Sequence, residues 1–249
     1  MLHIDDPDPV LTHNIDAAGP VLITCEHAGR ATPAALGDMG VGPADWERHI
    51  AWDVGAFDLS KALAERLQAR VVAQAYSRLV IDCNRALIAP DLTPEVSDGT
   101  EIPANRDLSE TAKAARIGAI HAPYHDRIAA EIERARPELL LSIHSFTPEM
   151  NGESRPWHAG FLANREPATA ETLLAIASGR EPYLTFAYNE PYTVDDISDF
   201  TIPVHGEKGG IPHALIEIRN DQLGTPGGID YWADLLAGAV NEYLRSRPE

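Results

Sequence analysis

Short apolar runs alternate along this chain with longer segments in which apolar residues recur every three or four positions. Continuous apolar runs are typical of strands buried on both faces of a sheet, and the longer period is typical of helices. We predict strands at residues 21–24, 71–76, 78–83, 138–144, 159–164 and 213–219. We predict helices at residues 43–70, 108–135, 169–178 and 230–246. This alternation predicts an α/β fold, in which a mostly parallel or mixed twisted sheet carries helices on both faces.

The helix expected at 43–70 depends on a spacing of three and four residues with one longer gap. The residues that carry it are Trp46, Ile50, Val54, Phe57, Leu63 and Leu67. Ser109 is expected to cap the helix at 108–135. Residues 86–106 contain three prolines and no period, so we expect an irregular loop that is a candidate lid for an active site. No repeat or linker is visible, and we expect residues 1–249 to form a single domain.

Charge and composition narrow the class of protein. The chain has 20 Lys and Arg against 38 Asp and Glu, a formal net charge of −18. This balance disfavours nucleic-acid binding, because phosphates are bound by clustered basic side chains. No apolar run reaches the roughly 18 residues of a membrane span, and the first residues lack the features of a signal peptide. With two cysteines, these features predict a soluble cytoplasmic protein without disulfides and leave its oligomeric state open.

Polar side chains accompany the ends of three predicted strands. His27 follows the first strand, His144 ends the strand that begins "ELLLS", and Glu217 lies in the last strand. In open α/β sheets, ligand sites gather beyond the carboxyl ends of the strands, so we expect these side chains to converge. Two imidazoles, an acid and a position for water make up the ligand set of a catalytic zinc. We therefore predict one divalent metal ion per chain, expected to be zinc.

The acidic ligand has two candidates, Asp53 and Glu26. Asp53 borders the buried stripe of the helix predicted at 43–70, where a carboxylate is costly unless it is paired or bound to a metal. A salt bridge to an internal arginine is the alternative explanation, and we favour Asp53 as the ligand. Glu26 precedes His27, and adjacent residues of a strand point to opposite faces, so the two share one ion only if the strand has already ended.

The stretch "YSRLVIDCNR" contains two arginines, Arg78 and Arg85, beside an apolar run in an acidic protein. One explanation is structural pairing of these arginines with Asp53 or Asp82. The other is a bidentate contact with a substrate carboxylate, which suits guanidinium geometry.

Two other chemistries are disfavoured. Cys25 and His27 have the spacing of residues on one face of a strand, but free cysteines are commonly buried and inert. The glycine-rich stretches "HGEKGGIP" and "GTPGG" are not followed by the Lys-Ser or Lys-Thr pair of a phosphate-binding loop. Neither a thiol nucleophile nor nucleotide binding is therefore expected.

Six stretches taken in order resemble the N-formylglutamate amidohydrolase family, which is related to zinc carboxypeptidases and N-acetylmuramoyl-L-alanine amidases. They are "CEHAG", "AWDVGA", "YSRLVIDCNR", "SIHSF", "NEPY" and "ALIEIRND". The resemblance implies a zinc-carboxypeptidase-like fold, a metal held by His27, Asp53 and His144, and Glu217 as general base. The HxxE spacing of the carboxypeptidases is absent after His27, so the acidic ligand does not carry over from those enzymes.

The resemblance also implies a substrate and its contacts. An Asn-Arg pair grips the substrate carboxylate in the carboxypeptidase relatives, and Asn84 and Arg85 resemble it. Arg78 would hold a second carboxylate or the oxyanion. Ser145 is a further candidate for substrate binding, and Tyr192 and His205 are weaker candidates for the pocket wall. The expected reaction is hydrolysis of a small anionic N-acylamino acid, foremost of N-formyl-L-glutamate to formate and L-glutamate. The alternatives are an amidase that acts on another N-acylamino acid or a cell-wall-type peptide, and a non-catalytic ligand-binding protein.

Overall fold

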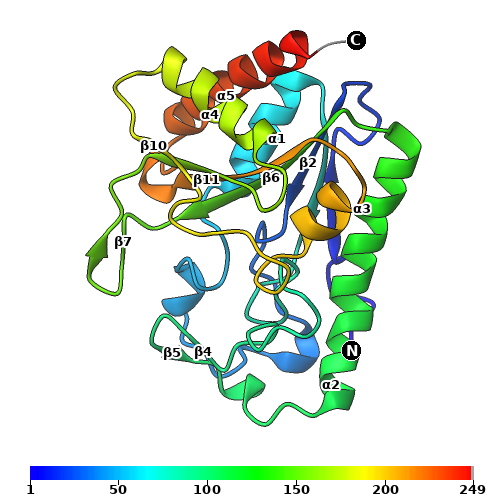
Figure 1. The fold of residues 1–249 in the computed structure, drawn as a ribbon. Helices are drawn as coiled ribbons and strands as arrows, with labels where there is room; N and C mark the ends of the chain where they lie inside the picture. The colour runs from blue at the N-terminus through cyan, green and yellow to red at the C-terminus, as the bar shows by residue number, and fades with distance from the viewer. Residues whose placement is uncertain (248–249) are drawn as a thin grey trace.

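A seven-stranded mixed sheet forms the centre of the computed structural model, which describes residues 1–247 (Figure 1). In spatial order its strands are β1 (Val10–His13), β3 (Arg70–Gln74), β2 (Val21–Cys25), β6 (Leu139–Phe146), β11 (His213–Arg219), β9 (Ala159–Leu162) and β10 (Phe186–Tyr188). The neighbours from β3 to β11 pair in parallel, whereas β1 and β9 pair antiparallel to β3 and β11. The predicted α/β class with a mixed sheet is confirmed.

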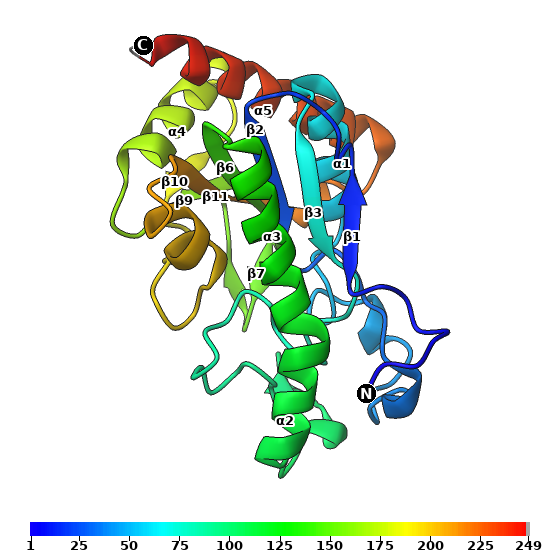
Figure 2. The same ribbon diagram turned by 90° about the vertical axis from the view of Figure 1, so that its right-hand side faces the viewer.

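Helices cover both faces of this sheet (Figures 1 and 2). One face carries α1 (Ala56–Leu67), α4 (Ala168–Arg180) and α5 (Pro226–Ser246). The other carries a continuous helical segment made of α2 (Glu110–Arg116), a π-helical turn (Ile117–His121) and α3 (Ala122–Ala135). Strand β2 shows why both layers form. Val21 and Ile23 pack into the first core and Leu22 into the second, because successive side chains of a strand point to opposite faces.

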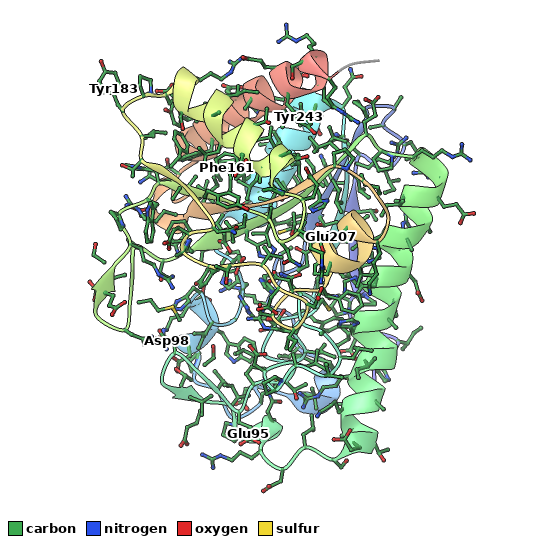
Figure 3. All side chains as sticks on the ribbon, in the orientation of Figure 1. Glu95, Asp98, Phe161, Tyr183, Glu207 and Tyr243 are labelled. Atoms are coloured by element: carbon green, nitrogen blue, oxygen red, sulfur yellow. The ribbon has the colours of Figure 1, made fainter. Side chains whose placement is uncertain are left out.

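The side chains between the sheet and helices α4 and α5 form the first core, in which Phe161 and Tyr243 are labelled in Figure 3.

Short elements complete the fold. They are 3-10 turns at Ala34–Leu36, Asp45–Glu47, Pro103–Asn105 and Asn220–Gln222, a π-helical turn at Ile202–Glu207, and the hairpins β4 (Val96–Ser97)–β5 (Thr100–Glu101) and β7 (Glu149–Met150)–β8 (Glu153–Ser154). No helix within residues 1–247 is long and apolar enough to cross a membrane.

The helix predicted at 43–70 is wrong in its first half. Within residues 43–70, only α1 is an α-helix, and the residues between 48 and 55 form turns and loop. The apolar residues that suggested one stripe divide between the two cores: Trp46 and Ile50 pack into the second, whereas Phe57 and Leu63 pack into the first. Asp53 therefore lies in a loop before α1, where its N–H donates to the carbonyl of His27 at 2.9 Å.

The strand predicted at 78–83 is also wrong. Its apolar residues are fully buried, but the backbone turns there, with the N–H of Val80 donating to the carbonyl of Ser77. These residues are apolar because they are buried, and a buried turn gives the same apolar run as a buried strand. The remaining predicted strands and helices are confirmed, as is Ser109, whose side chain accepts from the N–H of Ala112. Residues 86–106 are mostly irregular, apart from the β4–β5 hairpin and a 3-10 turn. Strands β1 and β10 were not predicted from the sequence.

Gly55 ends the loop that carries Asp53, and it offers a test of the packing there. Its φ is +82°, and a Cβ would lie 2.5 Å from Cβ of the buried Leu223. Gly99 has a similar φ of +75°, but a Cβ there would meet no atom within 4 Å. We expect Gly99→Ala to lower the free energy of unfolding by about 1–2 kcal/mol, the cost of a left-handed backbone. Gly55→Ala should cost about 2–4 kcal/mol, because overpacking adds to that strain. Chemical denaturation of both variants measures this, and equal losses would contradict it.

Candidate metal centre and active-site cavity

Three buried side chains from separate segments meet beyond the strand ends of the sheet. His27 follows β2, His144 lies in β6 and Asp53 precedes α1. One carboxylate oxygen of Asp53, Oδ2, lies 2.9 Å from Nδ1 of His144 and 3.4 Å from Nδ1 of His27. The ligand atoms of the three residues all lie within 4.8 Å of one another, and within residues 1–247 they form the single group of this kind.

A second pair of carboxylates holds the outer nitrogens of the same histidines. Nε2 of His27 lies 2.7 Å from Asp82, and Nε2 of His144 lies 2.9 Å from Glu26. Both imidazoles therefore turn Nδ1 toward Asp53 while a buried acid fixes the other nitrogen. Metal-binding histidines usually have an outer partner of this type, which sets the tautomer and the orientation of the ring. The donor set thus fits a metal ion held by His27, Asp53 and His144.

Glu26 lies outside this inner group. Its carboxylate accepts from Ser142 at 2.8 Å, from Thr201 at 2.8 Å and from Tyr124 at 3.2 Å. Burial by itself would raise the pKa of Glu26, but the hydrogen bond and charge of His144, together with the hydrogen bonds from Thr201 and Ser142, outweigh it and lower the pKa. The geometry therefore makes Asp53 the acid that faces both inner nitrogens, and Glu26 the acid behind His144.

Asp82 was not among the site residues predicted from the sequence. It accepts from Nε and Nη2 of Arg78 at 3.1 and 2.8 Å, in addition to its contact with His27. Burial would raise the pKa of Asp82, but the charges of Arg78 and His27 hold it well below its usual range. The signal for Asp82 was present in "RLVIDCNR", but a strand was expected there, and only the turn brings this carboxylate to His27.

Glu217 lies beside the metal-ligand candidates. It pairs with His144 in the register of β11 and β6, and it is 6% exposed. Its Oε2 makes no hydrogen bond with any atom of residues 1–247. Burial raises the pKa of Glu217 to about 7, with a further increase from the charge of Asp53. A carboxyl group that titrates near neutrality is suited to accept and return a proton.

A cavity of about 600 Å³ opens over these groups. Its lining includes nine of the residues predicted from the sequence: His27, Asp53, Arg78, Asn84, Arg85, His144, Ser145, Tyr192 and Glu217. Glu26 and His205 are not among the lining residues.

The two arginines of the cavity are both engaged. Arg78 contacts Asp82 and, through Nη1, Oδ1 of Asp53 at 3.4 Å, which agrees with the structural pairing considered from the sequence. Arg85 donates from Nε to Asp91 at 2.8 Å and from Nη1 to the carbonyl of Ser198. Both guanidinium groups therefore line the cavity and are also held in place by hydrogen bonds to the protein.

Asn84 and Ser145 join the segments around the cavity. The side-chain amide of Asn84 donates to Asp199 at 2.9 Å and accepts from the N–H groups of Phe200 and Thr201. The hydroxyl of Ser145 donates to the carbonyl of Val54 at 2.9 Å. Their contacts with the protein thus hold neighbouring loops in position.

Tyr192 and His205 have different surroundings. The hydroxyl of Tyr192 accepts from Nη1 of Arg155 at 3.0 Å at the cavity wall. His205 instead lies against His125, with 3.0 Å between their ring nitrogens, in a buried cluster with Phe200. Burial lowers the pKa of His205 to about 4, so it is neutral at pH 7.

Candidate metal ligands and a carboxyl group that titrates near neutrality in one cavity are typical of a hydrolase, and the comparison with protein families agrees on that class. The model of the N-formylglutamate amidohydrolase family matches residues 19–223, so the chain belongs to this family of hydrolases. Among curated proteins, no sequence matches the chain.

Solved structures extend the comparison to the whole chain. A gene product of Agrobacterium tumefaciens is 34% identical, with 98% of each chain covered and a TM-score of 0.93. N-formylglutamate amidohydrolase from Ralstonia eutropha is 20% identical over 96% of this chain and 99% of its own, with a TM-score of 0.68, and shares the fold. An N-acetylmuramoyl-L-alanine amidase from Clostridium difficile is 12% identical over 93% and 100% of the two chains, with a TM-score of 0.46.

The thiols give a direct test of the nucleophile alternative. Cys25 and Cys83 are both buried, and burial raises the pKa of each thiol well above its usual value. Since the thiolate is the reactive form, a thiol-specific chromogenic reagent should modify neither cysteine within minutes at pH 8. Both should react after unfolding in denaturant. Rapid modification of native Cys25 with loss of activity would restore the cysteine mechanism.

Proposed function

We propose that the protein hydrolyses the amide bond of a small N-acylamino acid with the help of a bound metal ion. The expected substrate is N-formyl-L-glutamate, with formate and L-glutamate as products. One observation carries the proposal: a buried His-Asp-His group and a carboxyl group with a pKa of about 7 line the same cavity. Family membership supports the class of reaction.

His27, Asp53 and His144 would hold the metal, and zinc is the ion that two imidazoles and a carboxylate suit best. When bound, zinc supplies Lewis-acid chemistry, which lowers the pKa of water toward neutrality and polarises an amide carbonyl. Asp82 and Glu26 keep the two imidazoles in the orientation and tautomer that such binding needs.

Glu217 would move the protons of the reaction. Its carboxylate takes one proton from the attacking water and passes it to the amide nitrogen as the carbon–nitrogen bond breaks. Water and amide thus become a carboxylic acid and an amine. The burial that raises the pKa of Glu217 makes both the uptake and the return of the proton accessible near pH 7.

The arginines would act on negative charge. Arg78, with its side chain 25% exposed to the cavity, would stabilise the charge that develops on the amide oxygen while it also holds Asp53 and Asp82. Arg85 would receive a substrate carboxylate, because its side chain lines the cavity and its partner Asp91 is half-exposed.

Metal binding can be measured directly. We expect about one zinc ion per chain by elemental analysis and loss of amide hydrolysis after treatment with a chelator. Asp53→Asn should weaken zinc affinity more than Glu26→Gln, for which we expect a 10- to 100-fold loss through the orientation of His144. A normal zinc content in Asp53→Asn together with none in Glu26→Gln would reverse the ligand assignment.

The role of Glu217 is tested by Glu217→Gln. This variant should keep its metal and lower kcat by roughly 100-fold or more, as the loss of a positioned proton acceptor does. In the unaltered protein, activity should fall as the pH drops, because protonation of Glu217, whose pKa is about 7 without a metal, removes the base. The positive charge of a bound metal moves that decline to lower pH. Retention of more than a tenth of kcat in Glu217→Gln, with metal content equal, would assign the proton transfer to another group.

Arg85→Ala tests the contact with the substrate carboxylate. A charge-assisted pair contributes about 1.5–3 kcal/mol, so kcat/KM for N-formyl-L-glutamate should fall roughly 10- to 150-fold. The loss should be much smaller for an analogue in which the carboxylate that Arg85 receives is replaced by an amide. Equal losses for acid and amide would show that Arg85 acts only by holding the surrounding loops.

A further inference from the structure

Arg78 and Arg85 differ in how firmly the protein engages them. The acids that hold Arg78 are Asp53 and Asp82, whose side chains are each 4% exposed. The acid that holds Arg85 is Asp91, whose side chain is 52% exposed. Removing a buried ion-pair partner leaves an uncompensated charge, whereas a half-exposed carboxylate can turn to water at little cost. Arg85 is therefore the cavity arginine that can exchange its protein partner for a ligand.

The fold nevertheless keeps Asp91 close to Arg85. The N–H of Asp82 donates to the carbonyl of Leu92 at 2.8 Å, which closes the chain from 82 to 92 into a compact loop. Leu92 is 1% exposed and anchors this loop in the second core. Arg85 and Asp91 lie on opposite arms of the loop, and both line the cavity. Their contact is therefore a result of the backbone path rather than a chance meeting of surface side chains.

Arg85 is fixed on its other sides as well. Its Nη1 donates to the carbonyl of Ser198, and its own carbonyl accepts from Nε2 of His121 at 3.2 Å. The hydrogen bond to Ser198 therefore still holds the guanidinium group when Asp91 departs, and the bond from His121 holds the backbone of Arg85. A ligand carboxylate at Arg85 would meet the charge of Asp91 next to it, and like charges in a partly buried site repel far more strongly than in bulk water.

We propose that Asp91 is a specificity-determining residue of the cavity, because its carboxylate holds on Arg85 the position that a substrate carboxylate takes. This inference rests on the proposed function, since it concerns the same cavity. Asp91 occupies Nε of Arg85, so a ligand carboxylate must displace it to make the bidentate contact with Nε and Nη2. Asp91 therefore weakens the binding of simple carboxylates and leaves an advantage to compounds with further contacts, such as an amide at the metal site. Discrimination through a competing charge is a recognised form of specificity.

The direct test measures binding without catalysis. Glutarate, a plain dicarboxylate, is titrated calorimetrically into the zinc-loaded protein and into Asp91→Asn. Asparagine has the shape of aspartate and Asp91 is half-exposed, so this variant is expected to fold; its thermal melting is the check. We expect the Kd for glutarate to fall about three- to tenfold, which is about 0.7–1.4 kcal/mol.

Asp98→Asn is the matched control. Asp98, which is labelled in Figure 3, lies on the same segment as Asp91 and lines the same cavity, but it pairs with Arg48 at 2.6 Å instead of Arg85. Asp98→Asn removes the same unit of charge as Asp91→Asn, and we expect it to change the Kd for glutarate less than twofold. An equal change in both variants would mean general relief of negative charge and would overturn the proposal. In an Arg85→Ala background, Asp91→Asn should have no effect, and a persisting effect would overturn it as well.

Kinetics then separate this inference from the proposed function. Each of the two carboxylates of N-formyl-L-glutamate can be replaced by an amide, which gives two monoamides. In Asp91→Asn, KM should fall for N-formyl-L-glutamate and for the monoamide that keeps the carboxylate bound by Arg85. It should not fall for the monoamide that lacks this carboxylate. An equal fall for all three compounds would contradict competition at Arg85. If no variant cleaves any of these amides while glutarate binding changes as expected, the proposed function fails and the role of Asp91 stands. If the amides are cleaved but Asp91→Asn binds glutarate no more tightly, the role of Asp91 fails alone.

Discussion

The shared carboxylate of Asp53 is the interaction on which the rest of the site depends. Its Oδ2 faces Nδ1 of both His27 and His144 and accepts from the N–H of Ser145, while Oδ1 contacts Arg78. One buried side chain thus joins the end of β2, strand β6, the loop before α1 and the turn at 78–85. Because a buried charge is costly unless it is paired, these partners must be present together for Asp53 to remain ionised. The folding of four separate segments and the geometry of the metal-ligand candidates are therefore coupled.

The buried carboxyl groups around this centre divide into two kinds. Asp53, Asp82 and Glu26 have lowered pKa values, because histidines and Arg78 outweigh their burial. Glu217 shares their burial, yet its Oε2 makes no hydrogen bond within residues 1–247 and its pKa is raised to about 7. Environments that separate the pKa values of neighbouring acids assign them different tasks. The three carboxylates with lowered pKa values are charged at neutral pH and hold the histidines and Arg78, and the fourth can exchange a proton.

The sheet topology explains why these groups meet at one edge. Strands β2, β6 and β11 are adjacent and parallel, so their carboxyl ends lie together. Long connections follow at the same end, and in Figure 2 the segments after β2 and β3 gather beyond the carboxyl ends of these strands. The connection after β3 meets the segment between β10 and β11 at Arg85, which contacts Asp91 and the carbonyl of Ser198. Strands β6 and β11 therefore supply His144 and Glu217, and the turn after β2 supplies His27. The surrounding loops supply the arginines that meet the substrate in our proposal.

The sequence by itself determined the alternation of strands and helices, the mixed α/β class and the strand-end residues His27, His144 and Glu217. These follow from local apolar periodicity and from the rule that strand ends carry ligand sites, and neither depends on distant contacts. Three features were decided only by the tertiary structure. Asp53 left its predicted helix because Ile50 and Phe57 pack into different cores. The run at 78–83 became a turn because its burial comes from the surrounding elements, and that turn brought Asp82 to His27. The engagement of Arg85 by Asp91 depends on the closure of a loop by one backbone hydrogen bond and one buried leucine. Periodicity reports that a residue is buried, but not which partners bury it, and for charged residues the partners decide the role.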